Sequence, residues 1–227
     1  MAFWVAGALA MAGAYVLGSV PTGYLAGRLI KGIDIRELGS RSTGATNVLR
    51  TLGPWPALVV LLVDVLKGAG AILFARWFCR WLCRSPSVAA PKTLDLETLG
   101  PWAVLLAGLA VLLGHSCAIW LNFKGGKSAA TGLGVLIAMC WPVGLGAAAA
   151  FGLLLAVFRI VSLSSMLAAF VAIALVFGLR QPAPYCLLVA AGGAYVVVRH
   201  RANIQRLLAG TEPRIERRPA PSAAKVG

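Results

Sequence analysis

The chain has 227 residues, of which 59% are hydrophobic and only 12% are charged, and its mean hydropathy is +0.85. Soluble globular domains are about half apolar and a quarter charged, so this composition excludes a soluble protein and indicates an integral membrane protein. The formal net charge of +14 would suggest a nucleic-acid partner in a soluble chain. In a membrane protein, basic residues set the orientation and meet anionic headgroups or substrates, and we expect no nucleic-acid partner.

Apolar segments follow one another along the chain. A helix crosses the bilayer core with about 20 apolar residues, within a range of about 17–25. The candidate spans are 3–27, 54–78, 101–121, 128–141, 143–158, 162–179 and 183–198. Pro142 divides a long apolar run into two short helices, for which a re-entrant hairpin is the alternative. The sequence therefore predicts an all-α polytopic integral membrane protein with about seven transmembrane helices, the first of which is not a removable signal peptide.

Basic residues are distributed unequally between the two sides that seven spans define. If the N-terminus is outside and the C-terminus cytoplasmic, the inner segments hold 15 Lys and Arg and the outer segments hold 5. Cytoplasmic loops carry such an excess of Lys and Arg, so we expect this orientation. Four polar segments would then meet at the cytoplasmic face. They are 39–50, 122–128, Arg159 with the serines after it, and 198–207.

The segment 39–50, with the sequence GSRSTGATNVLR, is a polar, glycine-rich loop between the first two apolar segments. It offers four hydroxyls, the amide of Asn47, and small residues that let backbone N–H groups approach a ligand closely. Arg41 and Arg50 add guanidinium groups, which bind phosphate or carboxylate through paired hydrogen bonds. These residue types are typical of an anion-binding site.

A second loop, NFKGGKS at 122–128, matches a Walker A phosphate loop only in part. The Walker motif requires a glycine where this chain has Leu121, and it joins a strand to a helix rather than two membrane spans. Nucleotide binding is therefore excluded. Gly125 and Gly126 are expected to expose N–H groups at a helix start beside Lys127, which suits a phosphate. A flexible loop whose lysines only set the topology is the alternative.

Two ionisable residues, Asp64 and Lys67, fall inside the second apolar segment and share one helix face. Charged groups at membrane depth are costly and face a bundle interior or a cavity. A structural ion pair and a direct contact with substrate both fit this spacing. The small residues Gly68 and Ala69 follow, and they allow another helix to pack closely there.

Several signatures of enzyme chemistry are missing from the sequence. No aspartate follows five residues after His115 or His200, and no GxSxG, HExxH or CxxC motif occurs. Ser162, Ser164 and Ser165 fit the capping of a helix start. The sequence thus predicts no metal site and no cofactor. Any chemistry would have to proceed without a strong protein base or nucleophile.

Taken in chain order, the motifs resemble those of the bacterial acyl-phosphate:glycerol-3-phosphate acyltransferases, the PlsY family. The resemblance covers nearly the whole chain and rests on an ordered set of segments. They are GSVPTGYLAGRL (18–29), IDIRELGSRSTGATNVLRTLG (33–53), DVLKG (64–68), GHSCAIWLNFKGGKSAAT (114–131), VSLSSM (161–166) and RHRANIQRLLAGTE (199–212).

The resemblance implies a multi-pass enzyme of phospholipid biosynthesis in the bacterial inner membrane, with its active site facing the cytoplasm. It would transfer a fatty acyl group from acyl phosphate to the 1-hydroxyl of glycerol 3-phosphate, giving lysophosphatidic acid and phosphate. The implied partners are these two substrates and the lipid bilayer, and no cofactor is implied. An organic-anion transporter or channel with a cationic cytoplasmic vestibule is the main alternative, and a structural lipid-binding subunit is another.

The resemblance also implies roles for individual residues. The implied catalytic residues are Ser40, Arg50, Lys127, Ser165, His200 and Asn203. The residues implied to bind substrate phosphate are Gly44, Thr46, Asn47, Arg50 and Lys127. Lys124 and Arg201 are expected to help electrostatically. The chain departs from the family pattern at Arg41, Ser42 and Thr43, where the family has Gly-Asn-Ile, and at Ser128, where it has Gly.

The chain is expected to contain one domain. Residues 1–210 would form a single transmembrane catalytic domain. The segment 211–227 is rich in Pro, Ala and charged residues, a composition typical of disorder, and we expect it to be a disordered cytoplasmic tail.

Overall fold

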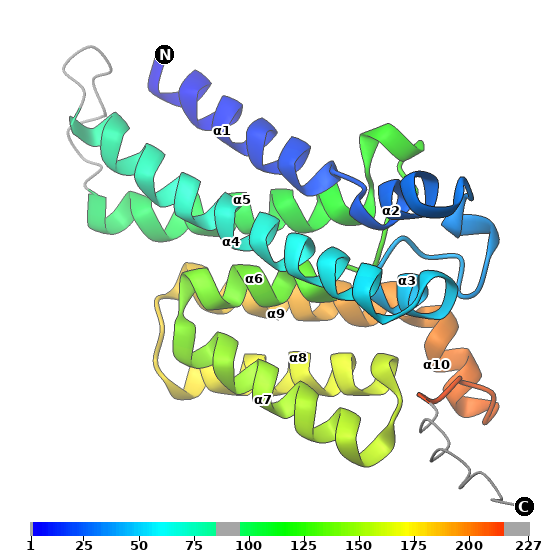
Figure 1. Cartoon of the computed structure of the whole chain (residues 1–227). Coiled ribbons are helices and arrows are strands. Elements are labelled where there is room, and N and C mark those ends of the chain that lie inside the picture. Colours follow the sequence, from blue (N-terminus) through cyan, green and yellow to red (C-terminus); the bar gives the residue numbers. More distant parts are fainter. Residues whose placement is uncertain (1, 85–95, 216–227) are drawn as a thin grey trace, which may run out of the picture.

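The long helices of the protein lie side by side in one bundle (Figure 1). The structure, a computed structural model, describes residues 2–84 and 96–215, and these ranges contain no strand. The all-α prediction is therefore confirmed for this part of the chain. The α-helices are α1 (Ala2–Ser19), α2 (Thr22–Lys31), α3 (Ala45–Leu52), α4 (Pro54–Arg84), α5 (Leu96–Ser116), α6 (Ala129–Met139), α7 (Trp141–Phe158), α8 (Val161–Gly178), α9 (Ala183–Arg199) and α10 (Arg201–Leu208). Two 3-10 turns, η1 (Ile35–Glu37) and η2 (Ile119–Leu121), lie in the loops.

The apolar helices match the predicted segments in number and order. Five stretches are long and apolar enough to cross a membrane: Gly7–Lys31, Pro54–Arg84, Glu97–Leu121, Trp141–Phe158 and Val161–Gly178. Helices α6 and α9 are apolar but shorter. Pro142 lies in the first turn of α7 and separates it from α6, as predicted. The count of seven crossings stays a prediction, because α6 covers only about 16 Å of a core about 30 Å thick.

Two predicted segments have different boundaries in the structure. Segment 3–27 is interrupted, because Pro21 has no backbone N–H to continue the ladder of α1, and α2 starts afresh and runs to Lys31. Segment 54–78 continues to Arg84, so that α4 has 31 residues and a length of about 46 Å. Helix α4 is therefore longer than a single membrane crossing requires.

Helices α4 and α6 pack closely because both carry glycine at their crossing. A Cβ atom at Gly68 would collide with the carbonyl oxygen of Thr131, and one at Gly134 would collide with the carbonyl oxygen of Val65. Small residues let helix backbones approach in a membrane, where close van der Waals packing drives association. The prediction that another helix packs against Gly68 is confirmed.

The short helices α2, α3 and α10 gather at one end of the bundle, opposite the start of α1 (Figure 1). The α5–α6, α7–α8 and α9–α10 connections lie at this same end. These elements contain the four polar segments that we expected to share one face. The bundle therefore concentrates its basic loops at a single end, which positions the candidate site described below.

After α10 the chain turns back toward the α7–α8 connection. The N–H of Ile215 donates to the carbonyl oxygen of Arg159 at 2.8 Å, and the Arg159 guanidinium donates to the carbonyl of Ile215. Glu212 is buried, with 9% of its surface exposed. Of residues 211–215 only Glu212 is buried, because it has charged and polar partners in the bundle, and the other four residues are exposed. Residues 216–227 lie outside the described residues.

Arg76 of α4 stabilises the far end of α6. Its guanidinium donates to the carbonyl oxygens of Ala138 and Met139 at 2.7 and 2.8 Å, and to the Tyr185 hydroxyl at 3.0 Å. The last carbonyls of a helix have no partner within it. We predict that Arg76→Gln lowers the free energy of unfolding by about 2 kcal/mol, measured by unfolding in detergent. The matched variant Arg80→Gln, at an exposed arginine one turn further, should have no measurable effect, and equal losses would contradict the assignment.

Candidate active site

A cavity of about 230 Å³ lies between residues of α3 and α10 and the interior of the bundle. Polar side chains from all four basic segments line one part of it, and Leu, Val, Ala and Phe side chains of the bundle line the rest. The structure brings together all the residues predicted to be catalytic or to bind phosphate, whereas Lys124 and Arg201, expected to help electrostatically, do not line the cavity. The residues brought together are Ser40, Gly44, Thr46, Asn47, Arg50, Lys127, Ser165, His200 and Asn203.

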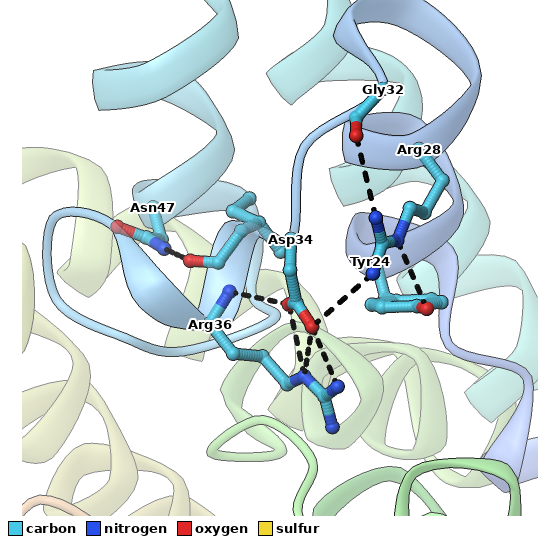
Figure 2. Close-up of polar contacts among 7 residues, drawn as sticks. Tyr24, Arg28, Gly32, Asp34, Arg36 and Asn47 are labelled. Atoms are coloured by element: carbon cyan, nitrogen blue, oxygen red, sulfur yellow. Dashed lines mark hydrogen bonds and ion pairs between the residues drawn. The ribbon is translucent and has the colours of Figure 1, made fainter.

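A charged cluster holds the start of the first loop (Figure 2). Asp34 accepts hydrogen bonds from the backbone N–H and the guanidinium of Arg36, and Arg28 lies 3.8 Å from the same carboxylate. Both guanidinium groups also lie over the ring of Tyr24. The hydrogen bonds from Arg36 lower the pKa of Asp34 to about 2. The carboxylate is therefore ionised at neutral pH and fixes the turn from which the loop begins.

The amide of Asn47 holds the rest of this loop together. Its Oδ1 accepts from the N–H of Ser40 at 2.8 Å, and its Nδ2 lies within 3.1 Å of the carbonyl oxygens of Ile35, Leu38 and Ser42. We expected Asn47 to bind phosphate. The structure instead commits its hydrogen-bonding groups to the loop backbone, because the buried turn has carbonyls that would otherwise lack donors.

The start of α3 faces the cavity without a side-chain cap. Gly44 precedes the helix and has no side chain to bond its first N–H groups. Such N–H groups have no partner inside the helix, and the helix dipole adds positive potential at this end. Thr46 lines the cavity in the first turn and the exposed Arg50 lines it in the second. This arrangement of donors and charge can bind a phosphate group.

The glycines of the second loop are used differently from our expectation. The N–H of Gly125 donates to the carbonyl of Ser116 at 2.9 Å, and that of Gly126 donates to the carbonyl of His115 at 3.0 Å. These carbonyls lie at the end of α5, where helical partners run out. A Cβ at Gly126 would also collide with the His115 ring. The glycines therefore dock the loop on α5, and the exposed N–H groups predicted here are not available to a phosphate.

Lys127, from this loop, reaches across the cavity to α10. Its Nζ donates to Oδ1 of Asn203 at 2.6 Å. Burial lowers the pKa of the Lys127 ammonium to about 8, and the nearby carboxylate of Glu212 opposes this shift. Lys127 is therefore mostly protonated at pH 7 and becomes neutral as the pH rises above about 8.

Glu212 is the acidic residue that joins these segments. Its carboxylate accepts from Ser162 of α8 at 2.7 Å, from Nδ2 of Asn203 at 2.6 Å and from Arg206 at 2.7 Å. Burial alone would raise the pKa of Glu212, but these hydrogen bonds outweigh it and hold the pKa below its ordinary value. Glu212 stays ionised and fixes both groups of Asn203, one toward itself and the other toward Lys127.

His200 lies between α9 and α10 as a neutral imidazole. Its Nδ1 is 2.7 Å from the carbonyl oxygen of Val196, and since a carbonyl only accepts, Nδ1 carries the proton. Burial lowers the pKa of His200 to about 4. The remaining ring nitrogen, Nε2, is therefore a hydrogen-bond acceptor at neutral pH. Ser165 donates its hydroxyl proton to the carbonyl of Val161 at 2.8 Å and keeps its oxygen lone pairs as acceptors.

The sequence left open whether Asp64 and Lys67 are structural. Lys67 lies 2.8 Å from Oδ1 of Asp64 and donates to the carbonyl of Val20 at 3.0 Å. Asp64 Oδ1 also accepts from Thr22 at 2.7 Å and lies 3.5 Å from Nδ1 of His115. The ion pair therefore ties α4 to the α1–α2 connection, to α2 and to α5. In the described ranges, no three His, Cys, Asp or Glu side chains are grouped so that they could hold a metal ion.

Comparison with known proteins shows the family to which the chain belongs. A sequence model of the family described as "Glycerol-3-phosphate acyltransferase" matches residues 8–210. The chain belongs to this family. It is 71% identical to "Glycerol-3-phosphate acyltransferase 2" of Rhizobium johnstonii, over 95% of this chain and 98% of that protein. It is 53% identical to the glycerol-3-phosphate acyltransferase of a Nostoc species, over 95% of both chains.

Solved structures of an acyltransferase of this family have the same fold. The crystal structure of PlsY, an integral membrane glycerol 3-phosphate acyltransferase, in its glycerol 3-phosphate form has a TM-score of 0.80 and 33% identity, and covers 92% of this chain and 96% of that one. The lysophosphatidic acid form has a TM-score of 0.76 and 34% identity, with 92% and 95% covered. The predicted acyltransferase of the PlsY family and the predicted polytopic membrane fold are confirmed, and these similarities do not support the transporter alternative.

Sequence reasoning missed Glu212 as a site residue of this acyltransferase. The residue ends the motif RHRANIQRLLAGTE that carried the family resemblance, but its neighbours have the composition of a disordered tail. Composition averages over a segment and gives no weight to a single buried acid. The signal that could have found Glu212 is its charge, since only 7 acidic residues face 21 basic ones in the chain.

Ser128 shows how the acyltransferase tolerates one departure from its family. The residue has a φ of 62°, in the left-handed region that favours the glycine of the family pattern. Its hydroxyl donates to the carbonyl oxygen of Leu112 at 2.7 Å and lies 2.6 Å from the Ser116 hydroxyl. These buried hydrogen bonds offset the cost of the backbone conformation. The substitution is therefore compatible with the position of Lys127 next to it.

We predict that Asn47→Asp abolishes most activity of the acyltransferase. A carboxylate cannot donate, and it would face carbonyl oxygens of the loop that now receive the amide N–H groups. The expected loss in kcat/KM is about a hundredfold or more, accompanied by lower thermal stability. Thr51→Val is the matched control on the same helix, where the Thr51 hydroxyl bonds only the helix backbone. Wild-type kinetics for Asn47→Asp would contradict the role assigned to this amide.

We predict that Glu212→Ala moves the alkaline limb of kcat/KM to lower pH. Protonated Lys127 is the form that attracts anionic substrate, so activity falls as the pH rises through its pKa of about 8. Removing the Glu212 carboxylate removes a group that raises this pKa, and Lys127 then loses its proton at lower pH. The control is Glu37→Ala at an exposed glutamate. A limb that stays in place in Glu212→Ala would show that the carboxylate does not act on Lys127.

Proposed function

We propose that this enzyme transfers a fatty acyl group from acyl phosphate to the 1-hydroxyl of glycerol 3-phosphate, releasing lysophosphatidic acid and inorganic phosphate. The observation that carries the proposal is the cavity, which combines cationic and polar groups from four loops with an apolar wall inside the bundle. Such a cavity suits a reaction between a phosphorylated polar acceptor and a lipid donor. The PlsY structures in glycerol 3-phosphate and lysophosphatidic acid forms support the same acceptor and product.

Acyl phosphate is the donor that the available groups favour. It is a mixed anhydride whose phosphate leaves readily, so it can react without a covalent acyl-enzyme. The site offers no activated nucleophile to form one, because the Ser165 hydroxyl is bonded to a backbone carbonyl rather than to a base. Binding both substrates in the reactive orientation and stabilising their charge would then supply most of the rate acceleration.

Different residues of the cavity bind the phosphate and the hydroxyl groups of the substrates. Arg50, Lys127 and the start of α3 bind phosphate oxygens and the negative charge that develops on the carbonyl oxygen. Asn203 orients Lys127, and neutral His200 accepts a hydrogen bond from the substrate through Nε2. The acceptor oxygen bonds to the acyl carbon as the bond from that carbon to the phosphate oxygen breaks. The hydroxyl proton passes to an oxygen of the departing phosphate.

The proposal includes a location for the reaction. The enzyme spans the bacterial inner membrane seven times, with its N-terminus outside and its C-terminus in the cytoplasm, as the excess of basic residues at the site end favours. The site then faces the cytoplasm, where glycerol 3-phosphate is dissolved. The acyl chain lies against the apolar wall of the cavity. Residues 1–210 together with the packed segment around Glu212 form one catalytic domain.

The direct test is the reaction of the purified protein with acyl phosphate and glycerol 3-phosphate. We expect equimolar phosphate and lysophosphatidic acid, and no product when acyl-CoA replaces acyl phosphate. Arg50→Ala should lower kcat/KM by about a hundredfold, since the lost guanidinium bonds are charge-assisted. Arg41→Ala is the control, because Arg41 is exposed and outside the cavity lining. Equal activity of Arg50→Ala and wild type would overturn the site, and equal use of acyl-CoA would overturn the donor.

A further inference from the structure

Asp64 is a buried carboxylate that lines the cavity and has only one oxygen engaged. Its side chain is 1% exposed. Oδ1 is surrounded by the Thr22 hydroxyl, the Lys67 ammonium and the His115 ring at 2.7, 2.8 and 3.5 Å. Oδ2 has no hydrogen-bond partner among the described residues. Asp64 is therefore bonded to the bundle through Oδ1, whereas Oδ2 is left without a hydrogen-bond donor.

An unsatisfied oxygen on a buried carboxylate is costly, and the cost is removed when a donor reaches it. Within the described chain, two other buried side-chain atoms lack a partner, Oγ1 of Thr131 and Nε of Arg199. Neither residue lines the cavity, whereas Asp64 does. Asp64 is thus the one residue with such an atom that lines the cavity.

The chemistry of this atom selects its ligand. A carboxylate oxygen only accepts hydrogen bonds, so it repels phosphate and has nothing to gain from an acyl chain. A hydroxyl is the group that satisfies it. Resting on the proposed function, we propose that Oδ2 of Asp64 accepts a hydrogen bond from the 2-hydroxyl of glycerol 3-phosphate and selects an acceptor that carries this group.

The partners of Oδ1 make Asp64 a binding residue for this hydroxyl. Two donors and a histidine ring hold Oδ1 in place, so that only Oδ2 of this carboxylate is left to contact a ligand. It is therefore suited to hold the hydroxyl that does not react, while the 1-hydroxyl remains free to reach the acyl carbon. A buried acceptor of this kind discriminates strongly against a molecule that lacks the hydroxyl, because the acceptor is then left unpaired.

The position of Asp64 is fixed relative to the loop 122–128, which carries Lys127. His115 lies between them, with Nδ1 near Asp64 and the other edge of its ring packed against Gly126. Lys127 follows directly and provides charge for the phosphate. Packed side chains and backbone therefore connect Asp64 to the loop that carries Lys127.

The test compares two acceptors, glycerol 3-phosphate and 3-hydroxypropyl phosphate, which lacks the 2-hydroxyl. Wild-type enzyme should prefer glycerol 3-phosphate by about tenfold to a hundredfold in kcat/KM, the value of a hydrogen bond to a charged group. In Asp64→Asn, the donors Thr22 and Lys67 keep the amide oxygen at the position of Oδ1, so the amide nitrogen replaces the free oxygen. The 2-hydroxyl can then only accept a hydrogen bond between neutral groups, which is weaker than one to a carboxylate. The preference should then fall by at least about tenfold, through loss of activity with glycerol 3-phosphate alone. A preference that is absent in wild type, or unchanged in Asp64→Asn, would overturn the proposal.

The control is Lys67→Gln, which disturbs the ion pair but leaves Oδ2 of Asp64 in place. A purely structural role for Asp64 predicts that both variants lose activity with the two acceptors equally, whereas our proposal predicts that Lys67→Gln keeps the preference. If Asp64→Asn does not fold, Asp64→Asn/Lys67→Met removes both charges together and is assayed in the same way. Failure of wild-type enzyme to acylate glycerol 3-phosphate would refute the proposed function itself, a result distinct from an unchanged preference.

Discussion

The geometry of the site depends on the hydrogen bonds of the Glu212 carboxylate. It holds Ser162 of α8 and both Asn203 and Arg206 of α10, and through Asn203 it positions Lys127 from the α5–α6 loop. Three of the four segments that form the cavity are therefore connected through one anion. A buried carboxylate needs several donors to remain ionised, and this requirement draws the segments together.

The positive charges gathered in the site repel one another, and hydrogen bonds offset part of this repulsion. Lys127 and Arg206 lie close to Glu212, and Arg199 donates to the carbonyl of Gly126 at 3.0 Å. Arg50 remains exposed at the mouth of the cavity. The cations thus lie at different depths, and a charge interaction is stronger where the dielectric constant is lower.

Much of the fold and site could be predicted from the sequence because hydrophobic length and charge asymmetry act over whole segments. The apolar runs gave the order of the helices, and the basic loops indicated a common end of the bundle. The roles of Asn47, Gly125 and Gly126 could not be predicted in this way. Whether an amide or an N–H group faces a ligand or the backbone depends on which carbonyls lie nearby after folding, and residue type alone carries no such information.

The contacts of Glu212 could not be predicted from residue type either. Its neighbours in sequence, rich in Pro, Ala and charge, predicted disorder, whereas its neighbours in space order it. Asp64 lies between these cases, because its position inside an apolar segment correctly indicated a buried role. The structure alone shows that Oδ1 is bonded to the bundle while Oδ2 has no partner among the described residues.

The return of the chain from α10 to Arg159 also sets where the working enzyme ends. Paired hydrogen bonds between Ile215 and Arg159 hold the segment that follows α10 against the α7–α8 connection. A shortened version cut at residue 210, just after α10, would keep all the apolar helices and lose both this segment and the Glu212 carboxylate. The smallest functional unit for engineering therefore includes residue 215, and fusion partners belong beyond it.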